Sequence, residues 1–135
     1  MSPEQRQWYE TQLRSPALNE RKSALDRLAH EPATEAVPIL HQLASGGDVF
    51  QRRLAMMGFG NHVTADSLAA LTNLISTETD SNVLAEAANS LFEFGAPAIP
   101  LLADLFMAQD HWLLRQTILA LLISSTDVGT LFEVA

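Results

Sequence analysis

Apolar residues recur along this chain in a pattern that repeats about every 31 residues. Within each repeat they stand three or four positions apart, which is the spacing of one face of an α-helix. A first series of equivalent positions comprises Val37, Leu40 and Leu43, then Leu68, Leu71 and Leu74, then Ile99, Leu102 and Leu105. This series predicts three equivalent helices, each with one buried face.

A second apolar series alternates with the first. It comprises Ala24 with Leu28, Ala55 with Phe59, Ala87 with Leu91, and Thr117 with Leu121, at steps of 31, 32 and 30 residues. Small residues at the first position of each pair suit a close approach between helices. Because the two series alternate, we predict an all-α, right-handed solenoid of about four helix pairs.

The repeat period and the turn residues together predict where the elements lie. We expect helices near residues 3–14, 16–30, 34–45, 48–60, 65–76, 81–94, 97–107 and 110–124. The corresponding repeats lie near 16–46, 48–77, 80–108 and 110–135, after an N-terminal helix at 1–14. The 135 residues fit a single domain.

Residues that can accept a hydrogen bond from a helix N-terminus precede the first helix of successive pairs. These are Asp48, Asp80 and Asp110, and Ser15–Pro16 occupies the same place earlier. Arginines follow at spacings that would allow ion pairs on one helix face, from Asp48 to Arg52 and Arg53 and from Asp110 to Arg115.

Glycines and prolines mark the helix ends. We expect left-handed backbone at Gly46–Gly47, Gly60–Asn61 and Gly95. Pro38 and Pro100 lie early in second helices, where each either belongs to the first turn or bends the helix.

The last segment, from Thr126 to Ala135, has the pattern of another second helix and stops on apolar residues. Terminal repeats of solenoids normally present a polar face to water. This edge therefore either docks on a partner or continues in a longer chain, and we favour the second interpretation.

Charge is unevenly distributed along the chain, whose net charge is −8. Residues 1–53 carry seven basic and seven acidic side chains, whereas residues 54–135 carry Arg115 against nine acidic ones. Acidic surface repels phosphates, so we expect no nucleic-acid partner and no membrane insertion. A basic protein partner is one interpretation, and an acidic surface that aids solubility is the other. The absence of a signal-like N-terminus predicts a cytoplasmic protein.

The sequence offers little catalytic chemistry. Its four histidines, His30, His41, His62 and His111, never stand three or four apart, and cysteine is absent, so we predict no metal site. His30 and His62 fall near helix ends, where they suit exposed carbonyl groups. No phosphate-binding or nucleophile motif occurs, so we predict no catalytic residue and no cofactor.

The second helices leave a column of residues between their buried positions. We refer to it as the second-helix strip, on what we expect to be the concave face. It comprises His41, Gln42, Ser45, Thr72, Asn73, Ser76, Asp104 and Met107. We predict that this strip binds a partner protein and that Trp112 adds an apolar contact. Most other aromatic and methionine side chains should lie in the core, namely Met56, Met57, Phe92, Phe94 and Phe106.

The phrase Gly95-Ala96-Pro97-Ala98-Ile99-Pro100-Leu101-Leu102, flanked by Asp80 and Asp110, resembles the HEAT-like repeats named after phycobilisome lyases. Leu13-Arg14-Ser15-Pro16, followed by Arg21, Ala24 and Leu28, looks like the helix opening of the same family. The resemblance covers roughly residues 13–124. It implies an interaction superhelix and, in one branch of the family, handling of bilin chromophores on phycobiliproteins.

Three functional hypotheses follow. The first is a non-enzymatic interaction scaffold or adaptor that uses the second-helix strip. The second, implied by the resemblance alone, is a bilin lyase subunit or a chromophore-handling protein whose partner is a phycobiliprotein. The third is a piece that extends a larger scaffold.

Overall fold

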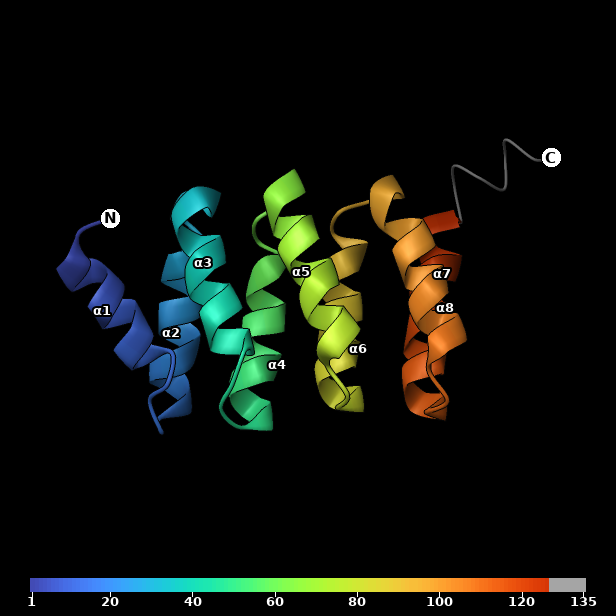
Figure 1. Ribbon diagram of the computed structural model, residues 1–135, viewed down its shortest axis with the longest axis horizontal. Coiled ribbons are helices and arrows are strands. Elements are labelled where there is room, and N and C mark those ends of the chain that lie inside the picture. Colours follow the sequence, from blue (N-terminus) through green and yellow to red (C-terminus); the bar gives the residue numbers. More distant parts are fainter. Residues whose placement is uncertain (127–135) are drawn as a thin grey trace.

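The computed structural model describes residues 1–126, which form eight α-helices and one short 3-10 helix (Figure 1). The elements are α1 (Pro3–Gln12), α2 (Leu18–Leu28), α3 (Ala33–Ala44), α4 (Val49–Phe59), α5 (Ala65–Thr77), α6 (Ser81–Phe92), η1 (Ala96–Ala98), α7 (Ile99–Ala108) and α8 (Trp112–Thr126). The predicted all-α solenoid is confirmed, and the helix bounds fall within two residues of those predicted, with η1 opening the last second helix. The further helix predicted at the C-terminus lies outside the described residues.

Successive helices alternate between two layers, so that helices of equivalent position stack side by side along the array (Figure 1). One layer holds α2, α4, α6 and α8, and the other holds α1, α3, α5 and α7. The most extensive contact joins α4 to α6 within the first layer, followed by the contact of α3 with α4 across the layers and that of α6 with α8. No helix in residues 1–126 is both long and apolar enough to cross a membrane.

The buried residues follow the predicted columns, apart from a shift at the start of each second helix and another near the end. Leu40, Leu43, Leu71, Leu74, Leu102 and Leu105 are buried, as are the pairs Ala24 with Leu28, Ala55 with Phe59 and Ala87 with Leu91. The predicted Val37, Leu68 and Ile99 are only half-buried, and the residues just before them, Ala36, Ser67 and Ala98, are buried in their place. In α8, Leu114 and Ile118 are buried, whereas Thr117 and Leu121 are only half-buried. The predicted pairing of Thr117 with Leu121 is therefore wrong. Ile118 stands 31 positions after Ala87, so the period continues there unchanged.

Two of the predicted N-cap residues are confirmed. The Asp48 carboxylate accepts a hydrogen bond from the Gln51 N–H at 2.8 Å, and Asp80 accepts from the N–H groups at the start of α6. Asp110 is not the cap, because α8 begins at Trp112 and His111 precedes it. Ser15 also stands too early, since α2 begins at Leu18. Its hydroxyl instead accepts from the Ala17 N–H at 3.1 Å.

The turn residues fall into two groups. Gly47 and Gly95 have φ of 73° and 71°, the left-handed backbone that glycine adopts at least cost. Gly60 has φ of −64°, so the left-handed prediction is wrong there. Glycine at this position serves close packing, because an added Cβ would lie 3.1 Å from the Ser90 Oγ. Pro100 lies in the first turn of α7 after η1, while Pro38 lies inside α3.

The arginines bind groups on other elements, and the predicted ion pairs to Asp48 and Asp110 are wrong. Arg52 pairs with Glu78 and Arg53 with Glu86, at 2.8 and 3.0 Å respectively. Arg115 donates to the backbone carbonyls of Phe106 and Gln109, at 3.1 and 3.0 Å, at the end of α7. These contacts join neighbouring elements of the solenoid.

Two buried polar side chains also link neighbouring helices of the first layer. The Ser90 hydroxyl on α6 donates to the Met56 carbonyl on α4 at 2.5 Å. His62 follows α4 and is buried, with a hydrogen bond to the Leu28 backbone at the end of α2. Burial lowers the pKa of His62, and the hydrogen bond only partly opposes this effect. His62 thus contacts helix-end backbone as predicted, but on the preceding helix pair, while His30 is exposed.

Candidate functional site

The second-helix strip lies on the outer side of α3, α5 and α7. Seven of its eight side chains are exposed, and Thr72 is half-buried. Because one apolar face of each helix is fixed in the core, the positions between the buried leucines point away from it. The strip is therefore available to a partner, with contributions from three helices of one layer.

A hollow of about 440 Å³ lies between α3 and α5. Three strip residues line it, His41, Ser45 and Asn73. Its lining is mostly polar, and it also includes Arg52 and Glu78. Arg52 comes from α4 in the other layer, so it places a basic side chain beside the strip.

A second hollow, of about 310 Å³, lies between α5 and α7. Strip residues Thr72, Ser76 and Asp104 line it. It is more apolar than the first, with Ile75 and Leu101 in its wall. The remaining strip residues, Gln42 and Met107, line neither hollow, and Met107 is 76% exposed.

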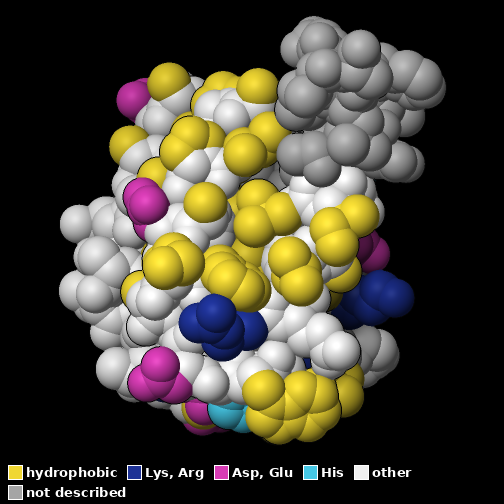
Figure 2. Space-filling model, turned by 90° about the vertical axis from the view of Figure 1, so that its right-hand side faces the viewer, with side chains coloured by type: hydrophobic (Ala, Val, Ile, Leu, Met, Phe, Trp, Pro, Cys, Tyr) yellow, Lys and Arg dark blue, Asp and Glu magenta, His cyan; other side chains and the backbone are white. Residues whose placement is uncertain are grey.

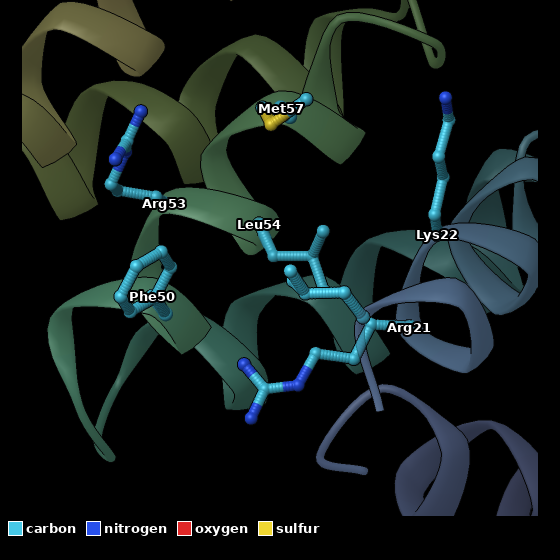
Figure 3. Close-up of a pocket in the computed structure, with 7 residues that line it drawn as sticks. Arg21, Lys22, Phe50, Arg53, Leu54 and Met57 are labelled. Carbon is cyan, nitrogen blue, oxygen red and sulfur yellow. The ribbon is translucent and has the colours of Figure 1, made fainter. Parts of the chain in front are cut away.

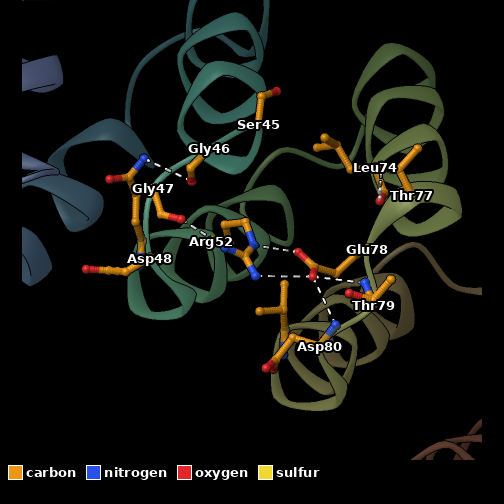
Figure 4. A network of polar contacts seen from close by, with 12 residues as sticks. Ser45, Gly46, Gly47, Asp48, Arg52, Leu74, Thr77, Glu78, Thr79 and Asp80 are labelled. Atoms are coloured by element: carbon orange, nitrogen blue, oxygen red, sulfur yellow. Dashed lines mark hydrogen bonds and ion pairs between the residues drawn. The ribbon is translucent and has the colours of Figure 1, made fainter.

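Glu78 lines both hollows and is held by a network that spans three elements (Figure 4). Its carboxylate accepts from Arg52 Nε at 2.8 Å and from the N–H groups of Thr79 and Asp80 at 3.0 Å each. Arg52 also donates to the Gly47 carbonyl at 2.9 Å. The network joins the α3–α4 connection, α4 and the α5–α6 connection, so it fixes the relative position of the helices around the first hollow.

The charged state of Glu78 is favoured by these donors. Burial raises its pKa, because the Glu78 side chain is only 7% exposed. Hydrogen bonds from Arg52 and from two backbone N–H groups outweigh this effect and hold the pKa of Glu78 below its usual value. The carboxylate therefore remains ionised at neutral pH, and its charge is matched by Arg52.

The hydroxyl groups of the strip are directed back to their own helices. Ser45 donates to the His41 carbonyl at 2.6 Å, Thr72 to the Leu68 carbonyl at 2.7 Å, and Ser76 to the Asn73 carbonyl at 2.6 Å. A hydroxyl whose proton is used in this way still offers oxygen lone pairs outward. Together with the exposed Asp104 carboxylate, these oxygens make the strip a surface of acceptors suited to partner N–H groups.

Trp112 lies elsewhere, at the start of α8, and is 67% exposed. Figure 2 shows apolar side chains gathered on the face at the α7–α8 end of the array. Exposed Leu113 and Leu119 belong to the same helix as Trp112. The structure does not bring Trp112 together with the two hollows of the strip. Of the other predicted core residues, Met56 and Phe94 are buried, whereas Met57 is exposed.

The sequence interpretation missed a hollow in the opposite layer. About 330 Å³ in volume, it lies between α2 and α4, and its lining is mostly apolar (Figure 3). The lining comprises Leu18, Arg21, Lys22, Phe50, Arg53, Leu54 and Met57. A signal for it exists in the sequence, since an apolar residue is followed three positions later by an arginine in both first helices, Leu18 with Arg21 and Phe50 with Arg53.

Among the described residues, no three histidine or acidic side chains lie close enough together to hold a metal ion. A model of the protein family described as HEAT repeats matches residues 39–123. No curated protein and no solved structure matches the chain.

Proposed function

Because this chain belongs to the HEAT-repeat family, whose members commonly act as protein-interaction scaffolds, we propose that it is a non-enzymatic scaffold that binds a partner protein along the second-helix strip. The partner segment would cross α3, α5 and α7 and enter the two hollows between them. The placement of six strip residues in two adjoining hollows is the observation that carries this proposal.

The chemistry of the strip indicates what kind of segment fits. Its hydroxyl oxygens and the Asp104 carboxylate accept hydrogen bonds, while Asn73 can both donate and accept. An extended segment with exposed backbone N–H groups, or one with lysine or arginine side chains, would supply the matching donors. The more apolar second hollow, with Ile75 and Leu101, would take an aliphatic side chain of the same segment.

The experiment first identifies the partner and then replaces side chains of the strip by alanine. The immobilised chain is used to capture proteins from a native lysate, and the affinity of the retained partner is measured by calorimetry. We expect the triple variant His41→Ala, Asn73→Ala and Asp104→Ala to weaken binding by about a hundredfold, which corresponds to about 1 kcal/mol for each of three contacts at the centre of the binding surface.

A matched triple variant on the other layer provides the control. Asn89, Glu93 and Gln116 are exposed and lie on or at the end of α6 and α8. Replacing all three by alanine also removes one carboxylate, and we expect the affinity to remain unchanged. Equal affinities of the strip variant and the unmodified chain for the captured partner, with both folded by circular dichroism, would overturn the proposal.

Bilin handling is a second candidate function, supported by the phrase Gly95–Leu102, which covers the connection after α6, η1 and the first turn of α7. In this role the chain would bind a linear tetrapyrrole or assist a phycobiliprotein. Titration of the chain with a linear tetrapyrrole tests it, because a bound bilin changes its absorption spectrum with its conformation. An unchanged spectrum together with a colourless captured partner would exclude this role.

A further inference from the structure

The hollow between α2 and α4 combines exposed apolar side chains with basic ones, and it lies on the layer opposite the second-helix strip. Leu18, Phe50 and Met57 are 71%, 63% and 47% exposed. Large apolar side chains that line one hollow at such exposure are typical of binding sites, because a partner that covers them gains the free energy of removing apolar surface from water.

Basic side chains surround this apolar centre. Figure 3 shows Arg21, Lys22 and Arg53 on different sides of the hollow, with Leu54 between them. They are three of the eight basic residues of a chain whose net charge is −8. No aspartate or glutamate is among the described residues that line the hollow. The local charge is thus opposite in sign to that of the whole chain.

These charges are only partly neutralised by the protein itself. Arg53 pairs with Glu86 at 3.0 Å, and Arg21 donates from Nε to the Ser15 carbonyl. The latter contact is with a neutral group, so the positive charge of Arg21 is retained. The Lys22 side chain is exposed and makes no hydrogen bond or ion pair within the described part of the chain.

The combination of exposed apolar and basic side chains does not continue into the next first helix of the solenoid. Lys22 is the equivalent of Arg53 in the preceding first helix, 31 positions earlier, but the positions equivalent to Phe50 and Arg53 in the next first helix are Asn82 and Ala85. A feature required only for stacking helix pairs would recur in each pair. The apolar and basic side chains are confined to α2 and α4, which indicates a local role for them.

We propose that this hollow is a second docking site, which binds an acidic amphipathic helix of a partner protein. Apolar side chains of that helix would contact Phe50, Leu54 and Met57, and glutamates or aspartates one turn away would face Arg21 and Lys22. Charge complementarity favours an acidic partner at this hollow, because its carboxylates are attracted to the basic rim. The acidic remainder of the chain repels the same carboxylates, so such a helix is directed to the hollow. The site is independent of the strip.

The methionines of this chain provide a local test. In protein labelled with ¹³C at the methionine methyl groups, Met57 reports on the hollow and Met107, on α7, reports on the other layer. The probe is a synthetic amphipathic peptide with leucine and phenylalanine on one face and glutamate beside them. We expect the Met57 signal to move on titration while the Met107 signal stays, and we expect the affinity to fall as salt is added.

Two variants with matched controls assign the effect to the hollow. Lys22→Glu should weaken peptide binding by about tenfold, whereas Arg6→Glu, an exposed charge reversal on α1, should leave it unchanged. Phe50→Ala should also weaken it by about tenfold, with Leu113→Ala, an exposed apolar residue on α8, as the control. All four side chains are exposed, so the variants should remain folded.

Three outcomes would overturn the proposal. One is a Met57 signal that does not respond to the acidic peptide, and another is equal binding of a peptide with lysine in place of each glutamate. The third is a Met57 response to vesicles of phosphatidylserine without any response to the peptide, which would assign the hollow to a lipid surface. None of these readouts involves the strip, so they leave the proposed scaffold function to its own test.

Discussion

Arg52 Nε lies 2.8 Å from Glu78 Oε1, across 26 positions of the chain, and this pair joins α4 to the connection that leads into α6. Glu78 is the more buried partner and accepts two backbone hydrogen bonds in addition. The pair therefore acts as a structural contact between successive repeats, and both hollows of the strip depend on its geometry.

Glu78→Gln should lower the free energy of unfolding by about 2 kcal/mol, because Arg52 loses its countercharge while it stays partly buried. The pKa of Glu78 is lowered in the folded state, so its stabilisation is present above the unfolded pKa and is lost as the pH falls through the folded value. Urea unfolding at neutral and acidic pH measures both effects. Glu93→Gln, at an exposed glutamate, should change neither.

His62 should make the protein less stable as the pH falls below about 6.5, the ordinary pKa of histidine. Its pKa is lowered by burial, so the unfolded chain binds a proton at a pH where the folded chain does not. The free energy of unfolding should therefore decrease on acidification through this range. His62→Gln should reduce that slope, whereas the exposed His30→Gln should retain it, and an equal slope in both variants would contradict this assignment.

Ser67→Ala should stabilise the protein by about 1 kcal/mol. The Ser67 hydroxyl is fully buried and has no hydrogen-bond partner among the described residues, so it loses its hydration without compensation. Alanine also favours helices more than serine does. The exposed Ser23→Ala on α2 measures that propensity effect alone, and the difference between the two melting temperatures gives the contribution of burial. No difference would mean that the hydroxyl is satisfied in solution.

Gly58→Ala should destabilise the protein by about 1–2 kcal/mol despite the higher helix propensity of alanine. An added Cβ would lie 2.5 Å from Leu40 Cδ2 and 3.0 Å from Leu25 Cδ1. Both leucines are buried, so neither can move without disturbing its own neighbours. Gly46→Ala is the control, because nothing lies within 4 Å of a Cβ there. Thermal unfolding of both variants gives the comparison.

The period of the apolar pattern allowed the helices and their buried faces to be predicted from sequence. Helix formation and burial of a stripe depend on spacing within one segment, and spacing is visible in the sequence. The error at Thr117 arose where the period was allowed to slip by one residue, whereas Ile118 keeps it. Polar residues at Asp48 and Asp80 predicted helix starts correctly for the same local reason.

Contacts between elements were harder to predict. Arg52, Arg53 and Arg115 each have an acidic residue four or five positions earlier, and the sequence gives no reason to prefer Glu78, Glu86 or backbone carbonyls. Which group an arginine reaches depends on how neighbouring helices are rotated and offset. The hollow between α2 and α4 depends on the same geometry, so the shared apolar and basic spacing of Leu18 with Arg21 and of Phe50 with Arg53 acquires meaning only when the helices are placed.

The stacking of each helix on its immediate neighbours has a kinetic consequence. Most contacts of α4 and α6 are with elements close to them in sequence, so little chain entropy must be lost before native contacts form. Such a topology favours rapid folding that begins in the central pairs and spreads outward. Amide hydrogen exchange should therefore be slowest in α4 and α6, which have a neighbour on both sides in their layer, and faster in α1 at the edge of the array.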